Sequence, residues 1–168
     1  MQTREKIIKD PVTNMYSFET FSKLSDLIIR SETREDRCAV LLFTVRNHDE
    51  LLEQYGRIMM RDMLMGFVGK IMIVYDPDHL TCYDGEHTMA LFVPVAGSDE
   101  ALIKLGEKIL KCLRNPAYFQ FQEEMLLDFS CGISVSEEKT SGFAELYDKA
   151  THALWSLDEE TDSHIAFA

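Results

Sequence analysis

Residues 83–94 read YDGEHTMALFVP, a stretch that opens as a polar turn and then becomes an apolar strand ending at proline. Asp84-Gly85 favours the positive backbone dihedral angles of a tight turn, and β-forming residues flank it on both sides. Residues 80–93 are therefore predicted to form a β-hairpin. Glu86 and His87 place a carboxylate beside an imidazole at the turn, which raises the question whether this hairpin is an active site.

Apolar periodicity on either side of the hairpin predicts alternating helices and strands. Ser17 can cap a helix, and residues 38–45 (CAVLLFTV) are typical of a buried central strand. Apolar residues at intervals of three and four predict helix from about 48 to 74, interrupted near Gly56. Further elements are expected at 101–113 (helix), 118–122 and 126–135 (strands), 143–157 (helix) and 164–167 (strand). This order contains a βααββαβ unit, which indicates an α/β (α+β) fold with an antiparallel or mixed sheet.

Length and composition indicate the number of domains and exclude some classes of partner. The chain has 168 residues, 46% of them hydrophobic, enough for one domain with a substantial core. The net charge is −12 without any Lys/Arg-rich patch, so we expect neither nucleic acid nor an anionic membrane as a partner. The chain has no long apolar run and no apolar signal-peptide core, which predicts a cytoplasmic protein without membrane insertion.

Cysteine spacing favours neither a disulfide framework nor a zinc site. Cys38, Cys82, Cys112 and Cys131 are scattered without a CxxC pattern. Most of them are expected to be small buried apolar residues.

Landmarks along nearly the whole chain resemble, in order, those of GGDEF domains, the bacterial diguanylate cyclases. Residues 10–17 (DPVTNMYS) resemble the family's DPLTGLYNR motif, and residues 83–94 match RYGGDEFAVLLP without a gap, ending on the same proline. Shorter similarities join 41–45 to LLLDID, 54–56 to TYG, 129–134 to VSIGIA and 150–155 to ADxALY. The resemblance implies the family's ferredoxin-like domain over residues 10–168, with a mixed, mostly antiparallel five-stranded sheet flanked by helices. Residues 1–9 would be the end of an N-terminal connector helix.

The resemblance also implies a chemistry. In the family, two domains face each other, each with GTP and divalent ions, and a 3′-hydroxyl of one GTP attacks the α-phosphate of the other to make cyclic di-GMP. Such a reaction needs hard oxygen ligands for Mg²⁺, donors for the triphosphate and groups that read guanine.

This chain departs from the family at the catalytic positions. The metal-ligating aspartate falls at Thr44, and the second aspartate of that strand at Arg46, whose charge has the opposite sign. In the gap-free register the signature keeps its first glycine at Gly85, and the four remaining signature positions read Glu86, His87, Thr88 and Met89. A register shifted by one residue would preserve an acid at Glu86 but would need an extra residue before Pro94, so we prefer the gap-free one.

The nucleotide positions have changed as well. The guanine-reading asparagine falls at Leu52 and its aspartate partner at Arg61, while the phosphate-holding lysine and arginine fall near Asp158 and Asp162. A hydrogen bond to a charged group is worth roughly 1.5–3 kcal/mol, so losing two costs on the order of 10² to 10⁴ in affinity. The product-inhibition motif RxxD would fall on residues 76–79 or one residue earlier, and neither register supplies an arginine.

These substitutions predict a catalytically inactive, degenerate GGDEF domain, a pseudoenzyme that regulates or binds other signalling proteins or domains in bacterial cyclic di-GMP-type signalling. The domain could also form a homodimer. No cofactor is expected, and Mg²⁺ only if residual cyclase activity remains. Two alternatives stay open: a residual diguanylate cyclase with an altered active site, and a domain that binds another nucleotide or anion through a changed pocket of Arg46, Arg57, Arg61 and Gly85.

Several single residues carry weaker signals. His87 has no companion at ligand spacing, and surface exposure is favoured over a metal site; only tertiary proximity could bring the scattered histidines 48, 79, 152 and 164 into a cluster. Trp155 stands at the family's tyrosine position and is expected in the core. For methionines 59, 60, 63 and 65, core packing is favoured over a pliable partner-binding surface.

Overall fold

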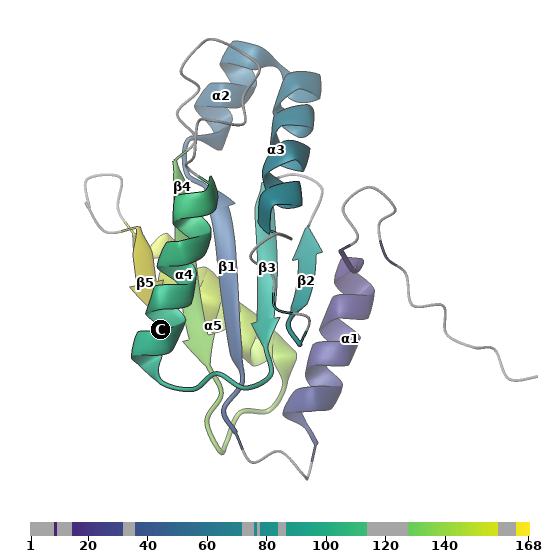
Figure 1. Ribbon diagram of the computed structural model, residues 1–168, viewed down its shortest axis with the longest axis vertical. Coiled ribbons are helices and arrows are strands. Elements are labelled where there is room, and N and C mark those ends of the chain that lie inside the picture. Colours follow the sequence, from purple (N-terminus) through teal and green to yellow (C-terminus); the bar gives the residue numbers. More distant parts are fainter. Residues whose placement is uncertain are drawn as a thin grey trace, which may run out of the picture.

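The computed structural model describes residues 9, 15–31, 36–71, 76, 78–83, 87–113, 128–157 and 164–168. Within these residues the chain forms five helices and five strands (Figure 1). Their order is α1 (Phe18–Ile29), β1 (Ala39–Val45), α2 (His48–Tyr55), α3 (Arg57–Ile71), β2 (Leu80–Tyr83), β3 (Thr88–Val93), α4 (Asp99–Leu113), β4 (Phe129–Val135), α5 (Phe143–Trp155) and β5 (Ile165–Phe167).

The strands form one sheet in the order β2-β3-β1-β4-β5. All neighbouring pairs are antiparallel except β4 and β5, which are parallel. β1 lies at the centre, where Leu41 is paired with Leu91 on one side and with Ile133 on the other. The predicted mixed, mostly antiparallel five-stranded sheet is confirmed.

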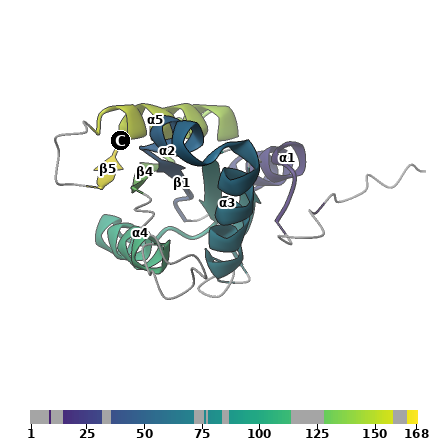
Figure 2. The ribbon, with the colours of Figure 1, turned by 90° about the horizontal axis from the view of Figure 1, so that it is seen from above.

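Helices cover both faces of the sheet, and alternate residues of β1 enter two separate cores. Leu41 and Phe43 belong to the larger core, to which α2, α3 and α4 contribute. Val40 and Leu42 belong to the smaller core beneath α1 and α5. Figure 2 shows α4 and α5 on opposite sides of the sheet. Because β1 is buried on both faces, its sequence is an uninterrupted apolar run rather than an alternating one.

Local signals in the sequence placed several element boundaries correctly. The Ser17 hydroxyl accepts a hydrogen bond from the backbone N–H of Thr20 at 3.2 Å, which is the predicted N-cap of α1. Gly56 has a φ of 82° and separates α2 from α3, as its interruption of the apolar pattern predicted. α4 begins earlier than predicted, at Asp99, because the Ser98 hydroxyl accepts from the N–H of Ala101 and caps the helix.

Two strand predictions need comment. The structure describes β4 from Phe129, and residues 126 and 127 of the predicted strand lie outside the described residues. The backbone of Asp128, just before β4, is bonded to the turn after β1: its carbonyl accepts from Arg46 N and its N–H donates to the Asn47 side chain. The predicted strand at 118–122 lies outside the described residues.

The prediction for Trp155 was wrong, because its side chain is 75% exposed. α5 turns Leu146, Ala150 and Ala153 toward the sheet. Trp155 follows Ala153 by two residues, about 200° around the helix, and therefore lies on the outer face. There its ring contacts that of His152.

The cysteines and methionines follow their predictions in part. Cys38, Cys82 and Cys131 are buried free thiols, and burial raises the pKa of the Cys131 thiol far above its usual range. In α3, Met60 is buried in the larger core whereas Met59 is exposed. Among the described residues, no helix has both the length and the apolar composition needed to cross a bilayer.

Candidate functional site

The ends of β1 and β3 bring three of the predicted catalytic positions together. Thr44 and Thr88 are directly paired across the two strands. The Thr88 hydroxyl donates to Thr44 Oγ1 at 3.4 Å, and the Thr44 hydroxyl donates to the carbonyl of His87, also at 3.4 Å. His87 Nδ1 lies 2.8 Å from Thr88 Oγ1. The three residues therefore form a hydrogen-bonded group in which two hydroxyls, a carbonyl and an imidazole take part.

A second histidine joins this group from a distant part of the sequence. His48 is the first residue of α2, and its ring centroid lies 5.0 Å from that of His87 with an angle of 81° between the rings. The short turn after β1 delivers His48 to the end of the sheet where the β2–β3 hairpin delivers His87. The sequence contained no signal for this pairing, because the two histidines lie in different elements and share no spacing.

Arg46 lies next to this group but is engaged with a carboxylate. Its backbone N–H donates to the carbonyl of Asp128 at 2.7 Å, and its Nε lies 3.9 Å from Asp128 Oδ2. The other oxygen of that carboxylate lies 3.4 Å from Nδ1 of His164, at the start of β5. The Arg46 side chain is only 10% exposed. The position where the family has a second acid therefore holds a cation beside the carboxylate of Asp128, which directly precedes β4 and to which no sequence motif pointed.

The nucleotide positions are divided between core and surface. Leu52 is partly buried and packs against the larger core, which agrees with its apolar side chain. Arg61 is exposed on α3, one turn after the exposed Arg57. Gly85, Glu86, Asp158 and Asp162 lie outside the described residues.

The described side chains of this group include no carboxylate that would hold Mg²⁺. Mg²⁺ is bound by carboxylates and water in near-octahedral geometry, and it needs acceptor oxygens. The hydroxyls of Thr44 and Thr88 are neutral and donate to neighbours in the group described above. In the part of the chain that the structure describes, no group of three or more His, Cys, Asp and Glu side chains is arranged to hold a metal ion.

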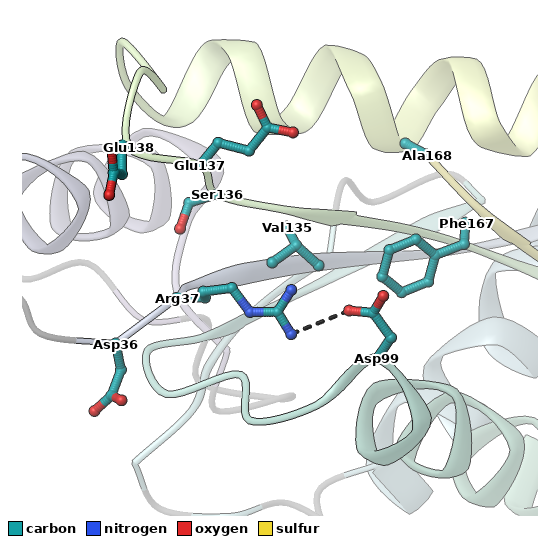
Figure 3. Close-up of a pocket in the computed structure, with 9 residues that line it drawn as sticks. All are labelled: Asp36, Arg37, Asp99, Val135, Ser136, Glu137, Glu138, Phe167 and Ala168. Carbon is teal, nitrogen blue, oxygen red and sulfur yellow. Dashed lines mark ion pairs between the residues drawn. The ribbon is translucent and has the colours of Figure 1, made fainter.

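A pocket of about 680 Å³ lies at the other end of the sheet (Figure 3). It is found where β1 begins and β4 ends, whereas Thr44 is near the end of β1. Arg37 donates to Asp99 Oδ1 at 3.0 Å and to the carbonyl of Gly97 at 2.6 Å. The lining residues are Asp36, Arg37, Asp99, Val135, Ser136, Glu137, Glu138, Phe167 and Ala168. Four carboxylates against one paired guanidinium make this pocket unsuitable for the phosphates of a nucleotide.

Comparison with known proteins agrees with the fold and names the family. A family model described as diguanylate cyclase, GGDEF domain, matches residues 7–163. A search of curated protein sequences found no significant match.

Solved GGDEF structures share the fold at low sequence identity. The GGDEF domain of DgcB from Caulobacter crescentus, solved in complex with c-di-GMP, has a TM-score of 0.77 and 14% identity, covering 99% of this chain and 96% of that one. The FimX GGDEF domain from Pseudomonas aeruginosa has a TM-score of 0.79 and 18% identity, covering 95% of this chain and 98% of that one.

Diguanylate cyclase SiaD from Pseudomonas aeruginosa, solved in complex with its activator SiaC, has a TM-score of 0.81 and 17% identity. The match covers 96% of this chain and 62% of SiaD. At these identities the structures establish the fold, while the family model extends over most of the chain. The chain belongs to the GGDEF domain family, the diguanylate cyclase domains of cyclic di-GMP signalling.

Proposed function

We propose that this GGDEF domain is catalytically inactive and that it acts as a regulatory or protein-interaction module in cyclic di-GMP signalling. The observation that carries the proposal is the hydrogen-bonded group of Thr44, Thr88 and His87. By the resemblance described above, these residues stand where a cyclase holds its metal-binding acids.

The loss of negative charge at these positions is the physical reason to expect no catalysis. Phosphoryl transfer depends on divalent ions that neutralise developing charge on the phosphates, and those ions are held by carboxylates. The hydroxyls of Thr44 and Thr88 are neutral and hydrogen-bond to their neighbours, so they are weaker ligands for Mg²⁺ than carboxylates. Arg46, at the second acid position, repels a cation, and its own charge is offset by Asp128.

The position that reads guanine in the family has also lost its polar side chain. Leu52 packs against the larger core and has no hydrogen-bonding side chain. Leu52 contributes to packing, which supports the proposal that this domain keeps the fold of a cyclase without its catalytic activity. Among proteins with this fold, SiaD was solved in complex with an activator protein, which makes a protein partner a reasonable expectation here.

The experiment is an assay of the purified chain with GTP and either Mg²⁺ or Mn²⁺, with nucleotides separated by chromatography. We expect GTP to remain unchanged while a competent GGDEF cyclase run in parallel makes cyclic di-GMP. Formation of cyclic di-GMP by this chain would overturn the proposal and would establish the residual-cyclase alternative.

Binding of another nucleotide or an anion is a second candidate function, favoured by Arg57 and Arg61 on one exposed face of α3. A ligand at 100 times its dissociation constant should stabilise the fold by about 2.7 kcal/mol. A thermal-shift screen of nucleotides and inorganic phosphate should then show a shift that the variant Arg57→Ala/Arg61→Ala loses. No shift with any of them, or an equal shift in the variant, would rule out this function.

A further inference from the structure

We propose that copies of this domain associate head to tail, with the first turn of α3 in one copy seated in the pocket of Figure 3 in the next copy. The inference rests on the interaction role proposed above and names a partner for it, a second copy of this chain. Its experiment measures association alone, so its failure would leave the outcome of the cyclase assay unchanged. The contact joins opposite ends of two domains and therefore differs from the family's arrangement, in which two domains face each other.

The first turn of α3 presents an apolar side chain beside two cations. Ile58 is 80% exposed, the highest value among the large hydrophobic residues that the structure describes. Arg57 and Arg61 are also exposed, and neither has an ion-pair partner within the described residues. The three residues are neighbours on one sector of the helix, and Asp62 borders them on the side away from Arg57. We call Arg57, Ile58 and Arg61 the α3 knob.

The pocket carries the opposite charge. The carboxylates of Asp36, Glu137 and Glu138 line it and have no ion-pair partner in the described part of the chain. The fourth carboxylate, that of Asp99, is already paired with Arg37 at 3.0 Å. Three uncompensated negative charges favour a cationic partner, and complementary charges fix the orientation in which two surfaces meet.

An apolar wall gives the pocket a place for the side chain of Ile58. Val135 and Phe167 line the pocket together with the carboxylates, and Phe167 is 38% exposed. The volume of about 680 Å³ lies within the range of pockets that enclose whole ligands, so it has room for one isoleucine and the stems of two arginines. An arginine can pack its aliphatic stem on such a wall while its guanidinium stays at the charged rim. Ile58 is therefore the apolar anchor of the contact, and the two arginines surround it.

The positions of the two surfaces require that the contact be made between copies. The α3 knob follows α2 beyond the end of β1, whereas Arg37 of the pocket precedes the start of β1, at the other end of the sheet (Figure 1). A knob cannot reach the pocket of its own chain across the length of the sheet. Because the knob and the pocket are different surfaces, each contact leaves one of each free, and association continues into a ring or a longer chain.

Sedimentation velocity over a concentration series up to about 1 mM tests the proposal. The net charge of −12 opposes association at long range, so the buffer holds about 0.15 M salt, which screens charges more than about 8 Å apart. Phosphate is left out because it would compete for the two arginines. We expect the average mass to rise with concentration. Arg57→Glu/Arg61→Glu and Ile58→Ser should each weaken association by about tenfold or more.

Two control variants make matched changes elsewhere on the surface. Lys104→Glu/Lys108→Glu changes the net charge by the same amount as the arginine variant, at two exposed positions of α4. Leu27→Ser removes an apolar side chain of α1 that is 68% exposed. Both controls should associate like the wild type.

A mixture of two variants tests whether the knob and the pocket are partners of each other. Arg57→Glu/Arg61→Glu keeps an intact pocket, and Glu137→Ala/Glu138→Ala keeps an intact knob. Each should stay monomeric by itself at concentrations where the wild type associates. Together they should form a complex of one copy of each that grows no further, because the one intact contact is then used. A monomeric wild type throughout the series, controls as weak as the knob variants, or no complex in the mixture would overturn the proposal.

Discussion

Thr44, which stands where the family has a metal-binding aspartate, is compatible with the β1 strand but supplies no carboxylate to a metal ion. The branched side chain of Thr44 suits the end of β1, and its hydroxyl finds partners in Thr88 and His87. A buried aspartate at the same place would need a cation or several donors to offset the cost of desolvating its charge. The substitution therefore costs the fold little, although it removes a metal ligand that the family's reaction requires.

Gly132 is the residue on which the close packing of α5 against the sheet depends. A Cβ atom added there would collide with the carbonyl oxygen of Ala150 and would lie 2.8 Å from Leu154 Cγ. We expect Gly132→Ala to lower the free energy of unfolding by about 1–3 kcal/mol, because α5 must move away from β4. Urea unfolding followed by circular dichroism measures this change.

Gly66 provides the control within the same molecule. It lies in α3, and an added Cβ would meet no heavy atom within 4 Å. Gly66→Ala should raise the free energy of unfolding by up to about 1 kcal/mol through helix propensity. If Gly132→Ala were as stable as the wild type, the close approach of α5 to β4 would be disproved.

At the scale of elements, the carboxylate of Asp26 joins α1 to α5. Its Oδ1 accepts from the backbone N–H of Phe143 at 2.9 Å, at the first turn of α5, and its Oδ2 lies 2.8 Å from Nε of Arg30. The hydrogen bond from Phe143 is the main cause that lowers the pKa of Asp26, and Arg30 adds to it. α5 has no side-chain cap from its own N-cap residue, Gly142, so this cap comes from another helix.

A lowered pKa in the folded state has a definite consequence for stability. The ionised carboxylate stabilises the fold above the pKa of Asp in the unfolded chain, about 3.9, and this contribution is lost as the pH falls through the lower folded-state pKa. Asp26→Asn keeps an acceptor but loses the charge. We expect it to be less stable than the wild type at pH 7, with a difference that shrinks as the solution is acidified below pH 4. Urea unfolding at both pH values checks this expectation, and a difference independent of pH would contradict it.

At the scale of the whole molecule, order is expected to decrease from the central strand outward. β1 is paired along its length with β3 and β4, and its residues from Ala39 to Phe43 are almost fully buried. Leu51 is the one buried residue of α2, and the Asn47 side chain is bonded to Asp128 rather than capping the helix.

Hydrogen exchange measured by mass spectrometry tests this order. Amides of β1 should exchange only through global unfolding, whereas those of α2 should exchange through local opening of lower free energy. Protection in α2 equal to that in β1 would contradict the expected order.

Local chemistry explains why so much of the fold was predictable. The antiparallel pair β2 and β3 follows from the β-forming residues of the two strands, the N-cap of α1 from the hydroxyl of Ser17, and the break between α2 and α3 from Gly56. Each of these features depends on residues near one another in the chain. The mixed five-stranded sheet and the family followed from the order of such features.

Other properties depend on distances between residues far apart in the chain. The sequence by itself determined most of the strands and helices, the GGDEF resemblance and the replacement of the family's acids at Thr44 and Arg46. Only the tertiary structure decided that Trp155 faces solvent, that Asp128 lies beside Arg46, and that His48 meets His87. Periodicity and turn chemistry act over a few residues, whereas a contact between α2 and the β3 hairpin exists only once the sheet has brought their ends together.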